Sequence, residues 1–309
     1  MIPPVSHAPR TAANLTALAL RYAAERAAPA GTIIKEILHY EVLYALVESG
    51  AARNLVFQGG TCLRLCHQGT RYSEDLDFAG GADFTPASVD PFLNLLQERI
   101  LGAYGLTLDM KAKRSPGEAV SVDRFTIRIQ VPQPDPSLPQ KQVINVEIAS
   151  VPSRDPDLLS VGANYDHLPG PLRSMVIVGE SKEEILADKV VALAGRPFIK
   201  HRDLWDLKFL ADQNVQLRPD LVSAKLGDYG IARHAFLSRL EERLLSLQGA
   251  DVKAAFRGEM SRFVDSKISA ALESDAMVQR FLSAAERYGQ AAIGALNASS
   301  PSSRSRPRP

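Results

Sequence analysis

The chain has little of the chemistry that marks secreted or membrane proteins. Its two cysteines, Cys62 and Cys66, are spaced on a predicted helix in a way that fits neither a disulfide framework nor a zinc site. No run approaches the roughly 18 apolar residues that a membrane helix requires. Near the N-terminus a short apolar stretch ends at Arg21, Glu25 and Arg26, unlike a secretory signal. A reducing cytoplasm is therefore the expected compartment.

The sequence also lacks an excess of charge of either sign. Lys and Arg total 36 against 35 Asp and Glu, a net charge of +1, which excludes the broad basic surplus typical of many nucleic-acid-binding domains. Any contact with RNA must then use a local patch. Hydrophobic residues make up 45% and charged residues 23% of the 309 residues, which excludes wholesale disorder and fibrous architecture. The length suits one large domain or two ordinary ones.

The first half of the chain predicts an α/β (α+β) core with a mixed sheet. Apolar residues at helical spacing predict helices over 13–28, 31–49 and 91–104. Short apolar or alternating segments predict strands over 54–58, 75–78, 106–113, 122–131 and 143–151. Between the first two strands, Gly59-Gly60 predicts a turn that opens a short helix to Cys66.

The second half predicts helices alone. Ser181 and Glu184 form a capping box that begins a helix reaching Ala194. Further helices are predicted over 201–213, 221–226, 231–247, 251–273 and 275–292. We therefore expect N-terminal helices plus the α/β core in 1–178, a helical domain that completes the active site in 179–296, and a disordered tail in 297–309.

One segment carries most of the recognisable chemistry. Asp75 and Asp77 are alternate residues of a predicted strand, so they project from one face of it. Two carboxylates at such a short distance repel each other unless a cation lies between them, and oxygen ligands suit Mg²⁺ or Mn²⁺. Upstream, Gly59-Gly60 leaves room for a phosphate, and the Thr61 hydroxyl and the amides of the next helix offer donors to an anion. The segment predicts that metal and phosphate meet here.

Two blocks of sequence carry recognisable motifs. The first is Gly-Gly-Thr-x-Leu from Gly59, followed by Arg-x-Ser-x-Asp-x-Asp from Arg71. The second contains Lys-x-x-Ala-Leu and an arginine, from Lys189 to Arg196, and then Arg-Asp-x-x-Asp-Leu from Arg202. In this order, the two blocks resemble the AbiEii/AbiGii-type nucleotidyltransferase toxins of the polymerase-β-like superfamily. The resemblance covers roughly residues 30–215 by motif and order. It implies metal-dependent transfer of a nucleoside monophosphate from an NTP to an acceptor hydroxyl.

The resemblance also implies a third metal carboxylate on a strand beside the one that carries Asp75 and Asp77. Glu147 fits this position, because it shares one face of its predicted strand with Asn145. The alternative is an exposed strand carboxylate without a role. Asp75, Asp77 and Glu147 are thus the predicted ligands of Mg²⁺ or Mn²⁺.

The second block supplies the predicted cations. Lys189 shares a largely apolar helical face with Leu186 and Leu193, and Arg196 falls on nearly the same stripe. Together the two cations are expected to hold the phosphates that leave as pyrophosphate. The alternative for Lys189 is a stem lying along a surface helix.

Further polar residues of the two blocks have two interpretations each. Asp203 and Asp206 are three residues apart on a helix, so both can face one neighbour, either the lysine or bound nucleotide, and Asp203 is the predicted catalytic one. A surface pairing with Arg202 is the alternative for Asp206. Arg71 and Ser73 alternate with the strand carboxylates, which suits either contact with nucleotide phosphate or a structural hold on the loop.

By resemblance, the protein is the toxin of a toxin–antitoxin or abortive-infection pair that blocks translation by modifying the 3′ end of tRNA. The implied partners are tRNA, an NTP and a cognate antitoxin protein, with no membrane, and a monomer is expected. Two alternatives remain, a nucleotidyltransferase acting on a small molecule such as an antibiotic, and a non-catalytic nucleotide-binding or interaction module. The candidate contacts to an RNA backbone are Lys111, Lys113, Arg114, Arg124, Arg128, Lys200, His201 and Arg202.

Overall fold

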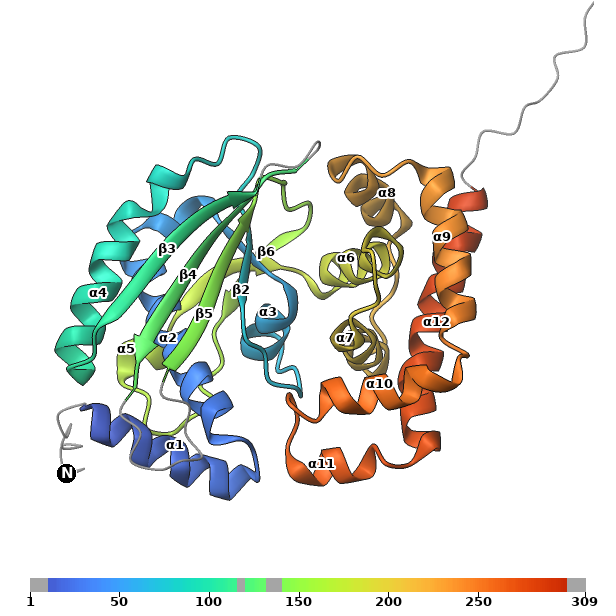
Figure 1. Cartoon of the computed structure of the whole chain (residues 1–309). Helices are drawn as coiled ribbons and strands as arrows, with labels where there is room; N and C mark the ends of the chain where they lie inside the picture. The colour runs from blue at the N-terminus through green and yellow to red at the C-terminus, as the bar shows by residue number, and fades with distance from the viewer. Residues whose placement is uncertain (1–10, 116–119, 132–140, 299–309) are drawn as a thin grey trace, which may run out of the picture.

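The computed structural model describes residues 11–115, 120–131 and 141–298. Their strands form one sheet in the order β3-β4-β5-β2-β1-β7-β6 (Figure 1). The strands are β1 (Val56–Gln58), β2 (Leu76–Ala79), β3 (Leu108–Ser115), β4 (Val122–Gln130), β5 (Lys141–Ala149), β6 (Pro156–Ser160) and β7 (Val176–Glu180). The pairs β2-β5 and β1-β7 are parallel and the other neighbours antiparallel, which confirms the predicted mixed sheet.

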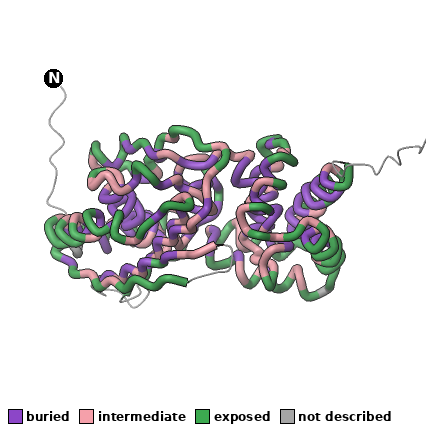
Figure 2. Tube along the Cα trace, turned by 90° about the horizontal axis from the view of Figure 1, so that it is seen from above, coloured by how far each residue is buried: buried purple, intermediate pink, exposed green. Residues whose placement is uncertain are grey.

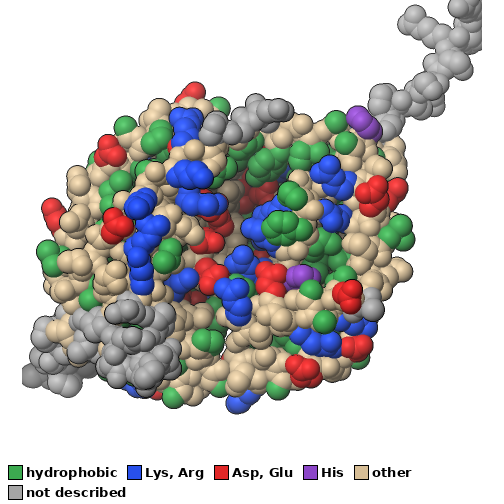
Figure 3. All heavy atoms as spheres, in the orientation of Figure 1, with side chains coloured by type: hydrophobic (Ala, Val, Ile, Leu, Met, Phe, Trp, Pro, Cys, Tyr) green, Lys and Arg blue, Asp and Glu red, His purple; other side chains and the backbone are tan. Residues whose placement is uncertain are grey.

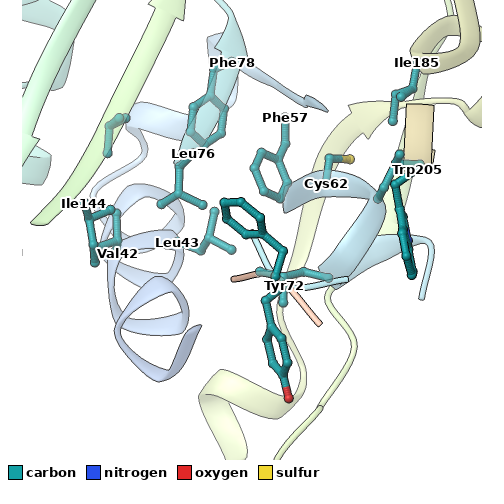
Figure 4. Close-up of a cluster of buried hydrophobic side chains, with 14 of the residues drawn as sticks. Val42, Leu43, Phe57, Cys62, Tyr72, Leu76, Phe78, Ile144, Ile185 and Trp205 are labelled. Carbon is teal, nitrogen blue, oxygen red and sulfur yellow. The ribbon is translucent and has the colours of Figure 1, made fainter. Parts of the chain in front are cut away.

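The helices of the first half cover one face of this sheet. They are α1 (Ala12–Arg26), α2 (Ala30–Glu48), α3 (Gly59–Cys66), α4 (Asp90–Tyr104) and α5 (Gly170–Arg173), with short 3-10 turns η1 (Ala51–Asn54) and η2 (Pro86–Val89). Helix α2 packs against β5 and α4. Figure 4 shows Val42 and Leu43 of α2 directed toward Leu76 and Ile144 of the sheet. The opposite face of β3, β4 and β5 has no described helix in front of it in Figure 1.

Alternation along the strands separates these two faces. In β4 and β5, the residues Phe125, Ile127, Ile144, Val146 and Ile148 are buried. Their neighbours in the sequence point to the open face, because successive residues of a strand point to opposite sides, and most of these neighbours are polar, with Val143 as an exposed apolar exception. The open face of the sheet is therefore the surface on which the predicted metal ligands lie.

The second half of the chain is helical, as predicted. Its helices are α6 (Lys182–Gly195), α7 (His201–Asp212), α8 (Pro219–Asp228), α9 (Arg233–Ser246), α10 (Ala250–Met260), α11 (Ser266–Ala271) and α12 (Asp275–Ala298). Helix α12 packs along α7 and α9. Seen from above, buried residues line the inside of both halves and exposed residues the outside (Figure 2). Trp205 of α7 stacks on Phe281 of α12, with ring centroids 4.6 Å apart.

Three details of the prediction need correction. The single helix expected over 251–273 is wrong, because the chain turns between α10 and α11, where the Phe263 carbonyl accepts from the Tyr72 amide and Asp265 caps α11. The sequence did not predict strands β6 and β7. The third correction concerns the tail. Residues 299–309, most of the expected tail, lie outside the described residues, and α12 includes Asn297 and Ala298. Apart from these corrections, no described helix has the length and apolarity to cross a membrane.

Candidate active site

A cavity of about 640 Å³ lies between the open face of the sheet and helices α6 and α7. Figure 3 shows it as a hollow in which acidic and basic side chains gather. All the predicted site residues except Thr61 line it, namely Gly59, Gly60, Arg71, Ser73, Asp75, Asp77, Glu147, Lys189, Arg196 and Asp203. The fold therefore brings the two blocks of sequence to one place.

The three predicted metal ligands lie on neighbouring strands. Strands β2 and β5 are parallel, and Asp77 is paired in register with Glu147, so their side chains share the open face. Asp75 comes just before β2 and accepts from Asn145 Nδ2 at 2.9 Å. Glu147 accepts from Arg124 Nε at 2.7 Å.

The charges of these carboxylates act on one another. Burial, together with the charges of Glu147 and Asp75, raises the pKa of Asp77 to about 6. Such a shift indicates negative charge that the surroundings leave uncompensated, which is the condition a divalent cation relieves. The oxygen donors suit Mg²⁺ or Mn²⁺. Among the described residues, however, no group of three or more Asp, Glu, His or Cys side chains has the geometry to hold a metal ion. The metal ligands stay a prediction.

The glycine turn is shaped by two side chains of the site. Gly59 has φ +78°, and a Cβ there would lie 2.9 Å from Asp77 Oδ2. A Cβ at Gly60 would overlap the Arg71 guanidinium. The Thr61 side chain is 1% exposed and its hydroxyl donates to the Asp75 carbonyl, so it holds the loop instead of facing an anion as expected. In this arrangement the room beside both glycines is filled by protein side chains.

A buried ion network joins the loop before β2 to α6 and α7. Arg71 donates from Nε and Nη2 to both Asp206 oxygens, each at 2.7 Å. Lys189 Nζ lies 2.6 Å from Asp203 Oδ1 and 2.8 Å from Asp206 Oδ2. Arg196 pairs with Asp203. Both aspartates do face Lys189, and Arg71 makes the structural hold that was one of its two predicted roles.

Two alternatives drawn from the sequence are wrong. Lys189 does not lie along the surface, because it is 7% exposed. Burial opposes its charge, yet Asp203 and Asp206 outweigh burial and raise its pKa. Burial likewise opposes charge on Asp203, but Lys189 and Arg196 lower its pKa to about 2. Arg202 does not pair with Asp206, since its Nε lies 3.2 Å from Glu259 Oε1. The pKa of Arg71 is raised and that of Asp206 lowered in the same way, so Arg71, Lys189, Asp203 and Asp206 stay ionised near neutral pH.

Several residues of the cavity were not assigned to it from the sequence, and two of them, Lys200 and Gln58, lie beside the predicted site residues. Lys200, predicted as an RNA contact, lines the cavity and makes no ion pair within the described part of the chain; burial and the charge of Arg196 lower its pKa. Gln58 is in register with Asp77 across β1 and β2, and its Oε1 is buried without a partner among the described residues. Gln58 could have been assigned to the site from its register with Asp77, because residues in register share a face of the sheet. The sequence alone does not give the pairing of the two strands.

Comparison with known proteins adds one family. The family model described as "Nucleotidyl transferase AbiEii toxin, Type IV TA system" matches residues 41–286. The solved structure of JHP933 from Helicobacter pylori is similar at a TM-score of 0.48 and 18% identity, covering 86% of this chain and 94% of that chain. A candidate nucleotidyltransferase from H. pylori is similar at a TM-score of 0.45 and 18% identity, covering 85% and 95%. No curated protein matches the chain.

Proposed function

Because the chain belongs to the AbiEii nucleotidyl transferase toxin family, we propose that it transfers a nucleoside monophosphate from an NTP to the 3′ end of tRNA, with release of pyrophosphate. The observation that carries this proposal is the pairing of Asp77 with Glu147 on the sheet, in one cavity with Lys189 of α6 and with Arg196, the residue that follows α6. Carboxylates on one wall and cations on the other suit a metal-bound triphosphate.

Asp75, Asp77 and Glu147 would hold the metal. When bound, Mg²⁺ supplies charge neutralisation at the triphosphate and lowers the pKa of the acceptor hydroxyl. Arg124 pairs with Glu147 through Oε1, so Oε2 is the oxygen that Glu147 would offer to the metal. Asn145 holds Asp75 in place through its amide. The raised pKa of Asp77 means that metal binding replaces a proton there near pH 6.

The cations of the opposite wall divide into two roles. Lys189 is neutralised by two aspartates, so its charge mainly fixes the wall. Arg196 is 38% exposed in its side chain and Lys200 has no ion pair among the described residues, so these two are best placed for the β- and γ-phosphates. Asp203 positions Arg196 by pairing with it, which is how it would contribute to catalysis.

The open face of the sheet supports an RNA acceptor. Lys113 is in register with Arg124, and Lys111 with Thr126, so these side chains share the face of Glu147. Figure 3 shows a band of Lys and Arg over β3 to β5 that leads to the hollow. Lys141 begins β5 on the same face and was missed in the sequence. A phosphate backbone on this band would reach the carboxylates.

Four of the predicted RNA contacts do not join this band, and one of them is Lys200, which lines the cavity instead. Arg114 is in register with Asp123, whose side chain is buried on the covered face, so Arg114 points away from the band. His201 and Arg202 both pair with Glu259. The RNA surface proposed here is therefore formed by Lys111, Lys113, Arg124, Arg128 and Lys141.

The test is incubation of the purified protein with labelled NTP, Mg²⁺ and total RNA, followed by sequencing of RNA 3′ ends. Label in tRNA is the expected result, and Asp77→Asn should abolish it. Label in a small molecule instead would replace the tRNA acceptor by a small-molecule one. No turnover with any NTP would refute the enzyme and leave a binding module. In the family's setting, blocked translation and a neutralising antitoxin complete the proposal.

A further inference from the structure

One end of the cavity is apolar and is formed by the helical half alone. A stripe along α6 faces it, and two residues that follow α8 close it. These residues are Ile185, Asp188, Ala192, Gly195, Tyr229 and Ile231. The α6 residues are three or four positions apart, which is the spacing of one helical face. Ile231 packs closely against α6 at Gly195, where a Cβ would lie 3.2 Å from Ile231 Cδ1, and these apolar groups border, together with Tyr229, the part of the cavity that we call the slot.

Asp188 brings a carboxylate to this apolar end. Its Oδ2 lies 2.9 Å from Lys225 Nζ, and its side chain is 19% exposed. Lys225 also lies 3.0 Å from Glu180 Oε1 and 2.7 Å from Glu184 Oε1, and these three side chains are 0% exposed. The Asp188 carboxylate is therefore fixed from behind by a buried cluster and opens only toward the cavity.

The cluster holds three carboxylates but one ammonium group. Glu184 accepts from Ser153 Oγ at 2.7 Å and from the amides of Arg154 and Asp155, each at 2.6 Å, so it is ionised. Glu180 Oε2 and Asp188 Oδ1 are both buried and have no hydrogen-bond partner among the described residues. One proton between these two oxygens satisfies both of them.

Burial raises the pKa of both carboxyl groups, and it raises that of Glu180 well above the ordinary range. We place the proton on Glu180, because its side chain is 0% exposed whereas that of Asp188 is 19% exposed. Protonated Glu180 then donates to Asp188, and Lys225 donates to the other oxygen. Asp188 is then the ionised member of the pair, and because its Oδ1 is buried, Oδ2 is the oxygen that keeps a lone pair for a donor in the slot.

We propose that this slot binds the nucleobase of the NTP and that Asp188 selects a base bearing an exocyclic amino group, excluding uracil. The proposal rests on the function proposed above and names its nucleotide. The amino group of cytosine or adenine donates to a carboxylate, whereas uracil presents a carbonyl oxygen at the corresponding position. Asp188 is adjacent on α6 to Lys189, and Arg196 follows the end of this helix. Both cations belong to the wall proposed for the phosphates, so the base and the triphosphate would lie along one helix.

The decisive measurement is the affinity of nucleotide pairs that differ at this position alone. CTP is compared with UTP, and ATP with inosine triphosphate, by calorimetry with Mg²⁺ and without any acceptor. The member with the amino group should bind at least about tenfold more tightly in whichever pair fits the slot, because its partner leaves the carboxylate unpaired against a carbonyl. Equal affinities, or tighter binding of UTP or inosine triphosphate, would overturn the inference.

Two variants separate the carboxylate from the cluster behind it. Asp188→Asn offers an amide donor to a carbonyl oxygen, so the preference should vanish or reverse. Glu180→Gln keeps a donor to Asp188 without reaching the cavity, so the preference should persist. Binding of nucleotides with an unchanged ranking in Asp188→Asn would refute only the base assignment. Absence of binding of all four nucleotides to the wild type would refute the proposed function, and this inference with it. The wild-type comparison decides the matter even if a variant fails to fold.

Discussion

Asp77 is expected to cost the folded protein stability in exchange for function. Its ordinary pKa is 3.8, and burial with the charges of Glu147 and Asp75 raises it to about 6. The folded state therefore binds more protons than the unfolded state between these values, so stability falls as pH rises through this window. At pH 7 the carboxylate is ionised in both states and the full cost applies.

The size of this cost follows from the shift. Each pKa unit corresponds to about 1.4 kcal/mol, so the shift sets an upper value of about 3 kcal/mol. Asp77 is partly exposed in the cavity, and solvent screening reduces the figure to roughly 1–2 kcal/mol. Asp77→Asn should then raise the free energy of unfolding at pH 7 by about this amount while removing nucleotide transfer.

Urea unfolding at pH values from 4 to 8, with and without Mg²⁺, checks the prediction. Without metal, wild type should lose stability between pH 4 and 7 relative to Asp77→Asn, and Mg²⁺ should stabilise the wild type far more than the variant. Asp109→Asn is the matched control, because Asp109 lies on the same open face but pairs with Arg128, away from the cavity. A variant at Asp77 that is less stable than wild type at pH 7, with no response to Mg²⁺ in either protein, would refute the reasoning.

The remaining predictions concern the cations. Lys189→Ala leaves two buried aspartates short of a partner, so urea unfolding should show destabilisation by about 3 kcal/mol, and nucleotide transfer should be abolished. Lys200→Ala should raise the Michaelis constant for NTP with unchanged stability, and equal destabilisation by both variants would contradict this division. For the RNA surface, Lys111→Ala with Lys113→Ala should flatten the salt dependence of tRNA binding by roughly one unit of slope for each phosphate that the variant no longer neutralises, with NTP binding intact. Arg114→Ala is its control and should leave the slope unchanged; a slope that responds to Arg114 alone would move the RNA surface elsewhere.

Periodicity was enough to locate the elements that carry buried faces. Five of the strands and most helices are confirmed because their apolar residues recur at the spacing of a half-buried strand or helix. Strands β6 and β7 were not predicted because their hydrophobic patterns are weak. β6 is an edge strand with Leu158 69% exposed, and β7 contains Gly179 and the buried Glu180. The break after α10 escaped because its cause is a distant contact, the Tyr72 amide on the Phe263 carbonyl.

The site divides in the same way. Alternation along one strand was enough to place Asp75 and Asp77 on one face, whereas the resemblance was needed to add Glu147 and the cations Lys189 and Arg196 to the site. Roles that depend on which residues meet in space were out of reach of the sequence. Arg71 meets Asp206 across 135 residues, and Arg114 leaves the RNA surface because of its register with Asp123.

The network explains in physical terms why the two blocks of sequence occur together. Gly60 lacks a side chain where the Arg71 guanidinium lies, Arg71 is bound to Asp206, and Asp206 shares Lys189 with Asp203. The four charged residues are buried, so a change in one of them leaves a buried charge without its partner. A continuous series of contacts thus links the glycine turn to α7. These contacts fix α6 against the sheet. They thereby also fix the distance between the carboxylates on the sheet and the cations of the opposite wall, on which the proposed transfer depends.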